Sequence, residues 1–206
     1  MAASKGVKVG GGVVALVLVV GGAFLAGKSM VGSRKQPAAS ESTVTATASP
    51  RAELVEFRDD KNGWAISYPK SWIRLQPKEA EVTLVVSEKP AEQNTGGSIL
   101  ARGLTLAAPV TEANLAAAKE VTDGIVTGEG IRHITEPKVV RQAGLPGYFY
   151  FYSFEDPASG QEGVHSHYFL FKGPTMISFV FQALPKDDFQ RLANLFDEVI
   201  GTFTIF

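Results

Sequence analysis

Hydrophobic and polar positions divide this chain into four stretches. Residues 9–27 contain no charged residue, and lysines or arginines flank this apolar run on both sides. A helix of 19 residues spans about 28 Å, which is close to the thickness of the hydrocarbon core of a membrane. The pattern therefore predicts a short basic N-terminus at 1–8, a transmembrane anchor at 9–27, a flexible linker rich in Ser, Thr, Ala and Pro at 28–52, and a globular domain at 53–206.

A cleaved signal peptide is the alternative interpretation of the apolar run. Such a peptide needs small residues at an A-x-A spacing just after its apolar core. Residues 23–26 have the wrong spacing, and Ala46-Thr47-Ala48 lies about 20 residues too far along the chain. We therefore favour an uncleaved anchor. The flanking basic residues are nearly balanced, but a long tail after a single N-terminal span favours an extracytoplasmic domain at the cell membrane.

Small residues recur four positions apart within the predicted anchor. They are Gly11, Ala15, Gly22, Ala23, Ala26 and Gly27. This spacing lets two helices approach closely in lipid, which would allow the anchor to pack against another transmembrane helix. Gly and Ala are also common in membrane spans, so a purely compositional origin stays open.

Alternating apolar residues dominate the globular part of the chain. Strands are predicted at 54–58, 64–68, 82–87, 98–107, 132–142, 147–155, 162–172 and 175–183, with a short final strand at 203–206. Asn62-Gly63 between the first two strands is a strong hairpin signal, because both residues tolerate positive φ. The central strands are bulky on both faces, which predicts a sheet covered on both sides.

Two helices are predicted to supply that cover. Thr111 is suited to cap a helix that runs to about residue 127, with an apolar stripe along one side. A second helix is expected to begin near Pro185 and to end at Gly201. The expected fold class is α+β, with one antiparallel sheet between helices.

Composition excludes several classes of protein. Residues 53–206 hold 14 Lys and Arg against 20 Asp and Glu. An acidic domain is unsuited to nucleic acid, which is bound by clustered basic residues. The chain has no cysteine, which excludes disulfides, thiol nucleophiles and a lipidated cysteine anchor. Searches for the common nucleotide, hydrolase and zinc-protease motifs find none, so we expect no enzymatic activity and no cofactor.

Two segments carry a family resemblance. Residues 60–72, DKNGWAISYPKSW, and residues 196–203, FDEVIGTF, resemble the opening and the closing helix and strand of the PsbP family and of related LpqN-type bacterial lipoproteins. The resemblance implies an α/β/α sandwich and a non-enzymatic role on a membrane complex or a partner surface. Many bacterial members carry a lipidated cysteine, which this chain lacks. No family binding motif matches, so the resemblance transfers no binding residue.

His165 and His167 form a candidate metal site. On a predicted strand this i, i+2 spacing places both imidazoles on one face, where they could ligate one metal with a third ligand from Glu162, Glu155 or His133. Phe169 and Phe171 continue the same face toward a core, which favours structural histidines. The register that decides their neighbours on the preceding strand stays open.

Tyr148, Tyr150 and Tyr152 are the second set of candidate residues. Tyrosine has an apolar ring and a polar hydroxyl, which suits a ligand or partner groove as well as packing beneath a helix. The leading hypothesis is a membrane-anchored accessory or assembly subunit that binds a membrane protein complex. The alternative is a module that binds a small apolar ligand such as a lipid, or a cell-envelope molecule such as a cell-wall fragment, in a pocket near these tyrosines.

Overall fold

The computed structural model describes residues 52–93 and 95–206. The predicted anchor at 9–27, with its six small residues, and nearly all of the predicted linker lie outside these residues. Within the described part, no helix is both long enough and apolar enough to cross a membrane.

Nine strands and two α-helices make up the described domain. The strands are β1 (Leu54–Asp59), β2 (Trp64–Pro69), β3 (Ile73–Arg74), β4 (Val82–Ser87), β5 (Gly96–Val110), β6 (Arg132–Gln142), β7 (Leu145–Glu155), β8 (Glu162–Leu184) and β9 (Thr204–Ile205). The helices are α1 (Leu115–Ile125) and α2 (Phe189–Gly201), with short 3₁₀ turns at Ala91–Gln93, Glu112–Asn114 and Lys186–Asp188.

The strands form two antiparallel sheets. The large sheet has the order β3-β4-β5-β8-β7-β6, and a small sheet has the order β1-β2-β9. The sequence predicted a single sheet, and this part of the prediction is wrong. The short first hairpin pairs with the C-terminal β9 and does not join the edge of the large sheet.

Strand β8 folds back on itself at Gly173, which has a φ of +58°. His165 Nε2 lies 2.9 Å from Gln182 Oε1, although the two residues are 17 positions apart. In one straight strand they would be about 55 Å apart. The two halves of β8 therefore lie beside each other and correspond to the two strands predicted at 162–172 and 175–183.

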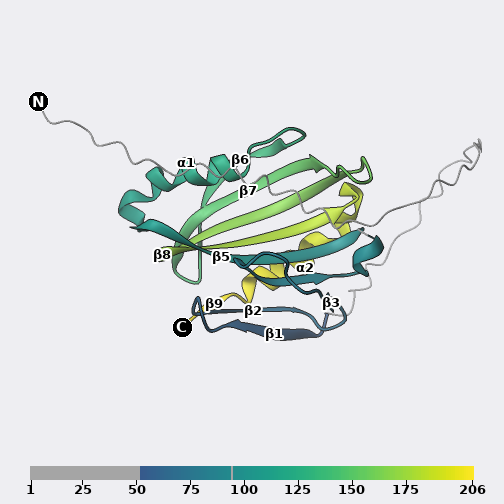
Figure 1. Cartoon of the computed structure of the whole chain (residues 1–206), viewed down its shortest axis with the longest axis horizontal. Coiled ribbons are helices and arrows are strands. Elements are labelled where there is room, and N and C mark those ends of the chain that lie inside the picture. The colour runs from purple at the N-terminus through teal and green to yellow at the C-terminus, as the bar shows by residue number, and fades with distance from the viewer. Residues whose placement is uncertain (1–51, 94) are drawn as a thin grey trace, which may run out of the picture.

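Different elements cover the two faces of the large sheet (Figure 1). Helix α1 covers one face, where Leu115 and Ala118 pack with Phe169 and Met176. Helix α2 and the small sheet cover the other face, where they share the largest apolar cluster with β4, β5 and β8. The predicted arrangement of a sheet covered on both faces is confirmed, although the small sheet was not expected to contribute.

The helix boundaries differ from the prediction at their ends. Thr111 is the N-cap residue of the turn that precedes α1, and its backbone N–H donates to Asn114 Oδ1 at 2.7 Å. The first turn, however, is 3₁₀, and α1 begins at Leu115. A 3₁₀ turn likewise separates Pro185 from α2. Such turns are common at helix termini because they satisfy the first free N–H groups.

Candidate functional site

The three candidate tyrosines lie on the α1 face of the large sheet, and all three are buried. The Tyr148 hydroxyl donates to the backbone oxygen of Leu115 at 3.1 Å. The Tyr150 hydroxyl lies 2.6 Å from Thr122 Oγ1 and donates to Asp123 Oδ1, also at 2.6 Å. These two hydroxyls therefore attach β7 to α1, and a contact with a ligand or partner stays a prediction.

Asp123 is the acidic member of this contact between β7 and α1. Partial burial opposes its ionised form, but hydrogen bonds from Lys119 and Tyr150 outweigh this effect and lower the pKa of its carboxyl. Burial and the hydrogen bond to Asp123 together raise the pKa of Tyr150. Both shifts favour a neutral tyrosine that donates to an ionised aspartate.

Tyr152 belongs to a buried polar chain with both histidines. The strand register pairs Tyr150 with His167 and Tyr152 with His165, which resolves the alternative left open by the sequence. The Tyr152 hydroxyl lies 3.0 Å from His165 Nδ1 and 3.2 Å from His167 Nδ1. His165 Nε2 reaches Gln182 Oε1 at 2.9 Å, and His167 Nε2 reaches Ser178 Oγ at 2.7 Å. We call these five residues the histidine chain.

The directions of the hydrogen bonds follow from the position of the Gln182 oxygen. An amide oxygen only accepts, so His165 carries its proton on Nε2 and accepts from Tyr152 at Nδ1. The Tyr152 oxygen then accepts from His167 Nδ1, and the Ser178 hydroxyl donates to His167 Nε2. Every polar group of the histidine chain that faces another member is thus satisfied while both imidazoles are neutral.

Burial also favours the neutral imidazoles. It lowers the pKa of His165 to about 4. For His167, burial is the largest cause of a pKa well below the usual value, and repulsion from Arg102, and from His165 whenever that ring is protonated, acts in the same direction. Arg102 on β5 is itself buried and pairs with Glu79 at 2.9 Å.

All four ring nitrogens of the two histidines already have hydrogen-bond partners. A metal would have to displace one partner at each ring that it binds. Of the possible third ligands, Glu155 and His133 are exposed, and Glu162 pairs with Lys186. Among residues 52–93 and 95–206, no three His, Asp or Glu side chains are grouped to hold a metal. The interpretation of His165 and His167 as structural histidines, with a metal site as the alternative, stays a prediction.

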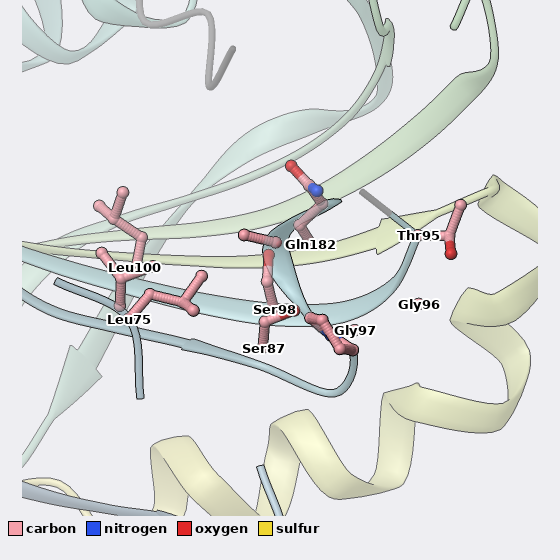
Figure 2. A pocket seen from close by; sticks show the side chains of 11 residues that line it. Leu75, Ser87, Thr95, Gly96, Gly97, Ser98, Leu100 and Gln182 are labelled. Atoms are coloured by element: carbon pink, nitrogen blue, oxygen red, sulfur yellow. The ribbon is translucent and has the colours of Figure 1, made fainter. Parts of the chain in front are cut away.

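The histidine chain ends at a hollow in the surface. The space between its walls, counted together with the open solvent at its mouth, amounts to about 470 Å³. It lies over β4 and β5 beside the second half of β8 (Figure 2). Its walls are formed by Leu75, Val85, Ser87, Pro90, Ala91, Thr95, Gly96, Gly97, Ser98, Leu100 and Gln182.

One wall of the hollow is fastened to α2. Glu88, at the start of the β4–β5 connection, receives two hydrogen bonds from Arg191 at 2.7 and 2.8 Å. Its Oε2 also accepts from the backbone N–H of Gly97 at 3.0 Å. The hydrogen bonds from Arg191 are the largest cause of the lowered pKa of Glu88. The connection that carries Thr95 is thereby held against the helix.

Gln182 and Ser98 were not predicted as site residues from the sequence. Both lie within predicted apolar strands, Ser98 in 98–107 and Gln182 in 175–183. Two polar residues, Ser178 and Gln182, interrupt the otherwise apolar 176–184 segment on one face. This interruption was the available signal, because a buried polar residue needs a partner.

Comparisons with known proteins identify the fold of the domain. No family model matches the chain, and no curated protein matches it. The solution structure of cyanobacterial PsbP (CyanoP) from Synechocystis sp. PCC 6803 matches with a TM-score of 0.50 and 18% identity, over 76% of this chain and 94% of that one. The crystal structure of LpqN from Mycobacterium tuberculosis matches with a TM-score of 0.54 and 14% identity, over 74% of this chain and 90% of that one. The described domain therefore has a PsbP-like α+β fold.

Proposed function

We propose that this protein is a non-enzymatic accessory or assembly subunit that binds a membrane protein complex outside the cytoplasm. Residues 9–27 would hold it in the membrane. The observation that carries the proposal is that the polar side chains best suited to chemistry already bind one another or α1. The two histidines and three tyrosines, which are the candidates for chemistry, form hydrogen bonds inside the domain.

Similarity to solved structures supports this proposal at the level of the fold. LpqN is involved in cell envelope biogenesis in Mycobacterium tuberculosis. A role at the envelope agrees with the uncharged run at 9–27, which is long enough to span a membrane as a helix.

Two separate contacts would act together in such a protein. The small residues of the anchor would pack against a transmembrane helix of the partner, and the domain would contact the same partner outside the membrane. A tether raises the effective concentration of the second contact, so each contact alone is allowed to be weak.

Strand β6 offers the domain side of this contact. It is an edge strand, and it carries Val139 at 68% and Ile134 at 49% exposure. Both side chains lie outside the apolar clusters of the domain, so they are available to be buried by a partner. Two irregularities in the pairing of β6 with β7 and the presence of Pro137 disfavour the addition of a further strand at this edge. We therefore assign recognition to side chains of β6.

Co-purification from native membranes tests the proposal. The tagged full-length protein is isolated after gentle solubilisation and compared with a deletion of 9–27, with Val139→Asp and with Ile73→Asp. Ile73 is 40% exposed on β3 at the opposite edge of the large sheet, so its variant is the matched control. We expect a stoichiometric membrane partner that is lost on deletion of 9–27, reduced several-fold by Val139→Asp and retained by Ile73→Asp.

Two results would contradict this proposal. A full-length protein that purifies without a partner excludes an accessory subunit. A reporter fused after Phe206 that is active only in the cytoplasm reverses the proposed orientation.

A further inference from the structure

The hollow at the end of the histidine chain has an uncharged lining. Ser87, Thr95, Ser98 and Gln182 supply hydroxyl and amide groups, while Leu75, Val85 and Leu100 supply apolar wall. Leu75 and Leu100 lie at one end of the hollow and Thr95 lies at the other (Figure 2). A lining of this kind suits a neutral ligand with both polar and apolar parts.

Gln182 presents a hydrogen-bond donor of fixed orientation to this hollow. Its side chain is only 9% exposed, and its Oε1 accepts from His165 Nε2 at 2.9 Å. Its amide nitrogen makes no hydrogen bond to any described residue. This nitrogen is not fully enclosed by the protein, and Gln182 is part of the lining of the hollow. Because His165 holds the oxygen, the NH₂ group is the part of the amide that is left to bind a ligand.

The histidine chain accounts for this orientation. A free glutamine amide can rotate to offer either its oxygen or its nitrogen. Here Ser178, His167, Tyr152 and His165 fix the oxygen through consecutive hydrogen bonds. A donor held in place before binding loses little conformational freedom when the ligand arrives.

The required ligand group follows from these features. It must offer an acceptor to Gln182 Nε2 and an apolar part to Leu75 and Leu100. No lining residue carries a charge that would pair with a charged ligand. An extended peptide is disfavoured, because β5 is paired along both of its edges and offers no free strand edge here. An acetamido group has the required carbonyl oxygen and methyl group, and the sugar hydroxyls that accompany it would face the Ser and Thr hydroxyls.

We propose that the hollow beside Gln182 binds the acetamido group of a neutral N-acetylated sugar. The proposal is independent of the accessory function, because it concerns a ligand of the domain and not its protein partner. A site of this size engages few ligand atoms, so a single sugar is expected to bind with a Kd in the millimolar range.

Saturation-transfer NMR on the full-length protein tests this proposal. The protein is kept in micelles of a detergent without a sugar head group. N-acetylglucosamine is the probe, glucose is the matched sugar without an acetamido group, and N-methylacetamide represents a bare peptide unit. We expect the acetyl methyl of N-acetylglucosamine to receive the strongest saturation and glucose to receive none.

Three variants locate the binding. Gln182→Glu keeps an acceptor for His165 but replaces the NH₂ donor with an oxygen. Ser87→Leu fills the hollow without altering the histidine chain, and it decides the outcome if Gln182→Glu does not fold. Gln190→Glu adds the same charge at an exposed position on α2. The methyl signal is expected to fall at least about fivefold in the first two variants, because one loses the hydrogen-bond donor and the other loses the space for the ligand. It is expected to persist in the third variant.

Three outcomes would overturn the proposal. The first is no saturation of N-acetylglucosamine at about 50 mM, well above a millimolar Kd. The second is saturation that neither Gln182→Glu nor Ser87→Leu reduces. The third is saturation of N-methylacetamide without N-acetylglucosamine, which would assign the hollow to a peptide group.

Discussion

His165 and His167 are two residues apart and touch the same tyrosine hydroxyl, but they have opposite roles in the histidine chain. The hydroxyl of Tyr152 has one proton, so it donates to one ring and accepts from the other. Gln182 decides which ring accepts from Tyr152, because its oxygen requires a proton on His165 Nε2 and so leaves His165 Nδ1 as the acceptor.

We predict that His165 is the Nε2–H tautomer and His167 the Nδ1–H tautomer at neutral pH. The ¹⁵N and ¹³C chemical shifts of the two imidazoles in selectively labelled protein distinguish these forms. Gln182→Glu, which retains an acceptor for His165, should leave the assignment unchanged. The reverse pair of tautomers would mean that the Gln182 amide is turned, and it would remove the oriented donor from the hollow.

Alanine substitutions at two glycines are predicted to change the free energy of unfolding in opposite directions. A Cβ added at Gly97 would lie 2.6 Å from the ring of Trp72 and 3.0 Å from Leu192, whereas one added at Gly124 in α1 meets nothing within 4 Å. Gly97→Ala should therefore cost about 1–3 kcal/mol of the free energy of unfolding through overpacking. Gly124→Ala should instead add about 0.5–1 kcal/mol, as expected for an exposed helical site.

Urea unfolding followed by tryptophan fluorescence measures both changes. The two tryptophans of the chain, Trp64 and Trp72, are buried in the described domain and report on it directly. Equal effects of the two substitutions would show that the backbone near Trp72 moves to accept a methyl group.

Three chain segments meet at the turn of β8. Lys172 Nζ donates to the backbone oxygens of Gly63 at 2.8 Å, Phe206 at 3.0 Å and Asn62 at 3.3 Å. These bonds join the folded-back β8 to the β1–β2 turn and to the residue that follows β9. One ammonium group thus connects the small sheet with the large one.

Replacement of this lysine is expected to loosen the small sheet. Lys172→Met keeps the apolar part of the side chain but removes three charge-assisted hydrogen bonds, which should lower the free energy of unfolding by about 1–3 kcal/mol. Lys78→Met, at an exposed position, is the control. Hydrogen exchange should be accelerated mainly in β1, β2 and β9, and uniform acceleration across both sheets would contradict this role.

The family-like segment 60–72 shows what the sequence could predict. Trp64 is fully buried, and Trp72 is 9% exposed in the same cluster. Asn62 packs on Gly103 of β5, where an added Cβ would lie 2.6 Å from its side chain. These residues hold the two sheets together. Their pattern therefore allowed the fold to be predicted from the sequence, but it did not indicate a ligand.

The candidate site was harder to predict, because it depends on the pairing of distant strands. Alternation placed His165 and His167 on one face, but their partners Ser178 and Gln182 come from the other half of β8. Only the turn at Gly173 brings these halves together, and its register is not encoded in either strand alone. The separation of the small sheet was missed for the same reason, since β9 has only two residues.

For the molecule as a whole, the buried histidines link stability to pH. Burial lowers the pKa of His165 to about 4, and the pKa of His167 is also lowered. In the unfolded chain a histidine has a pKa of about 6.5, so the unfolded state binds more protons at pH values below this. The contribution of neutral, buried histidines is complete above about pH 6.5, and it is lost as the pH falls from 6.5 through about 4.

The charged groups around the histidine chain do not reverse the loss of stability at lower pH. Arg102 on β5 faces His167 and disfavours its protonation, while Tyr152 on β7 and Ser178 and Gln182 on β8 are uncharged near neutral pH. Glu88 and Asp123 have lowered pKa values in the folded protein. The stability that these two carboxylates contribute is therefore lost only as the pH falls below the pKa of an ordinary carboxyl group.

We therefore predict that the domain loses stability between about pH 7.5 and pH 5, by roughly 2 kcal/mol from His165 alone. Urea unfolding followed by tryptophan fluorescence at several pH values measures the slope. His165→Gln removes one buried imidazole, so this variant should be less stable at pH 7 but should show a clearly shallower slope than the wild type. Identical slopes would mean that His165 binds protons equally in the folded and unfolded states, as a solvated imidazole does.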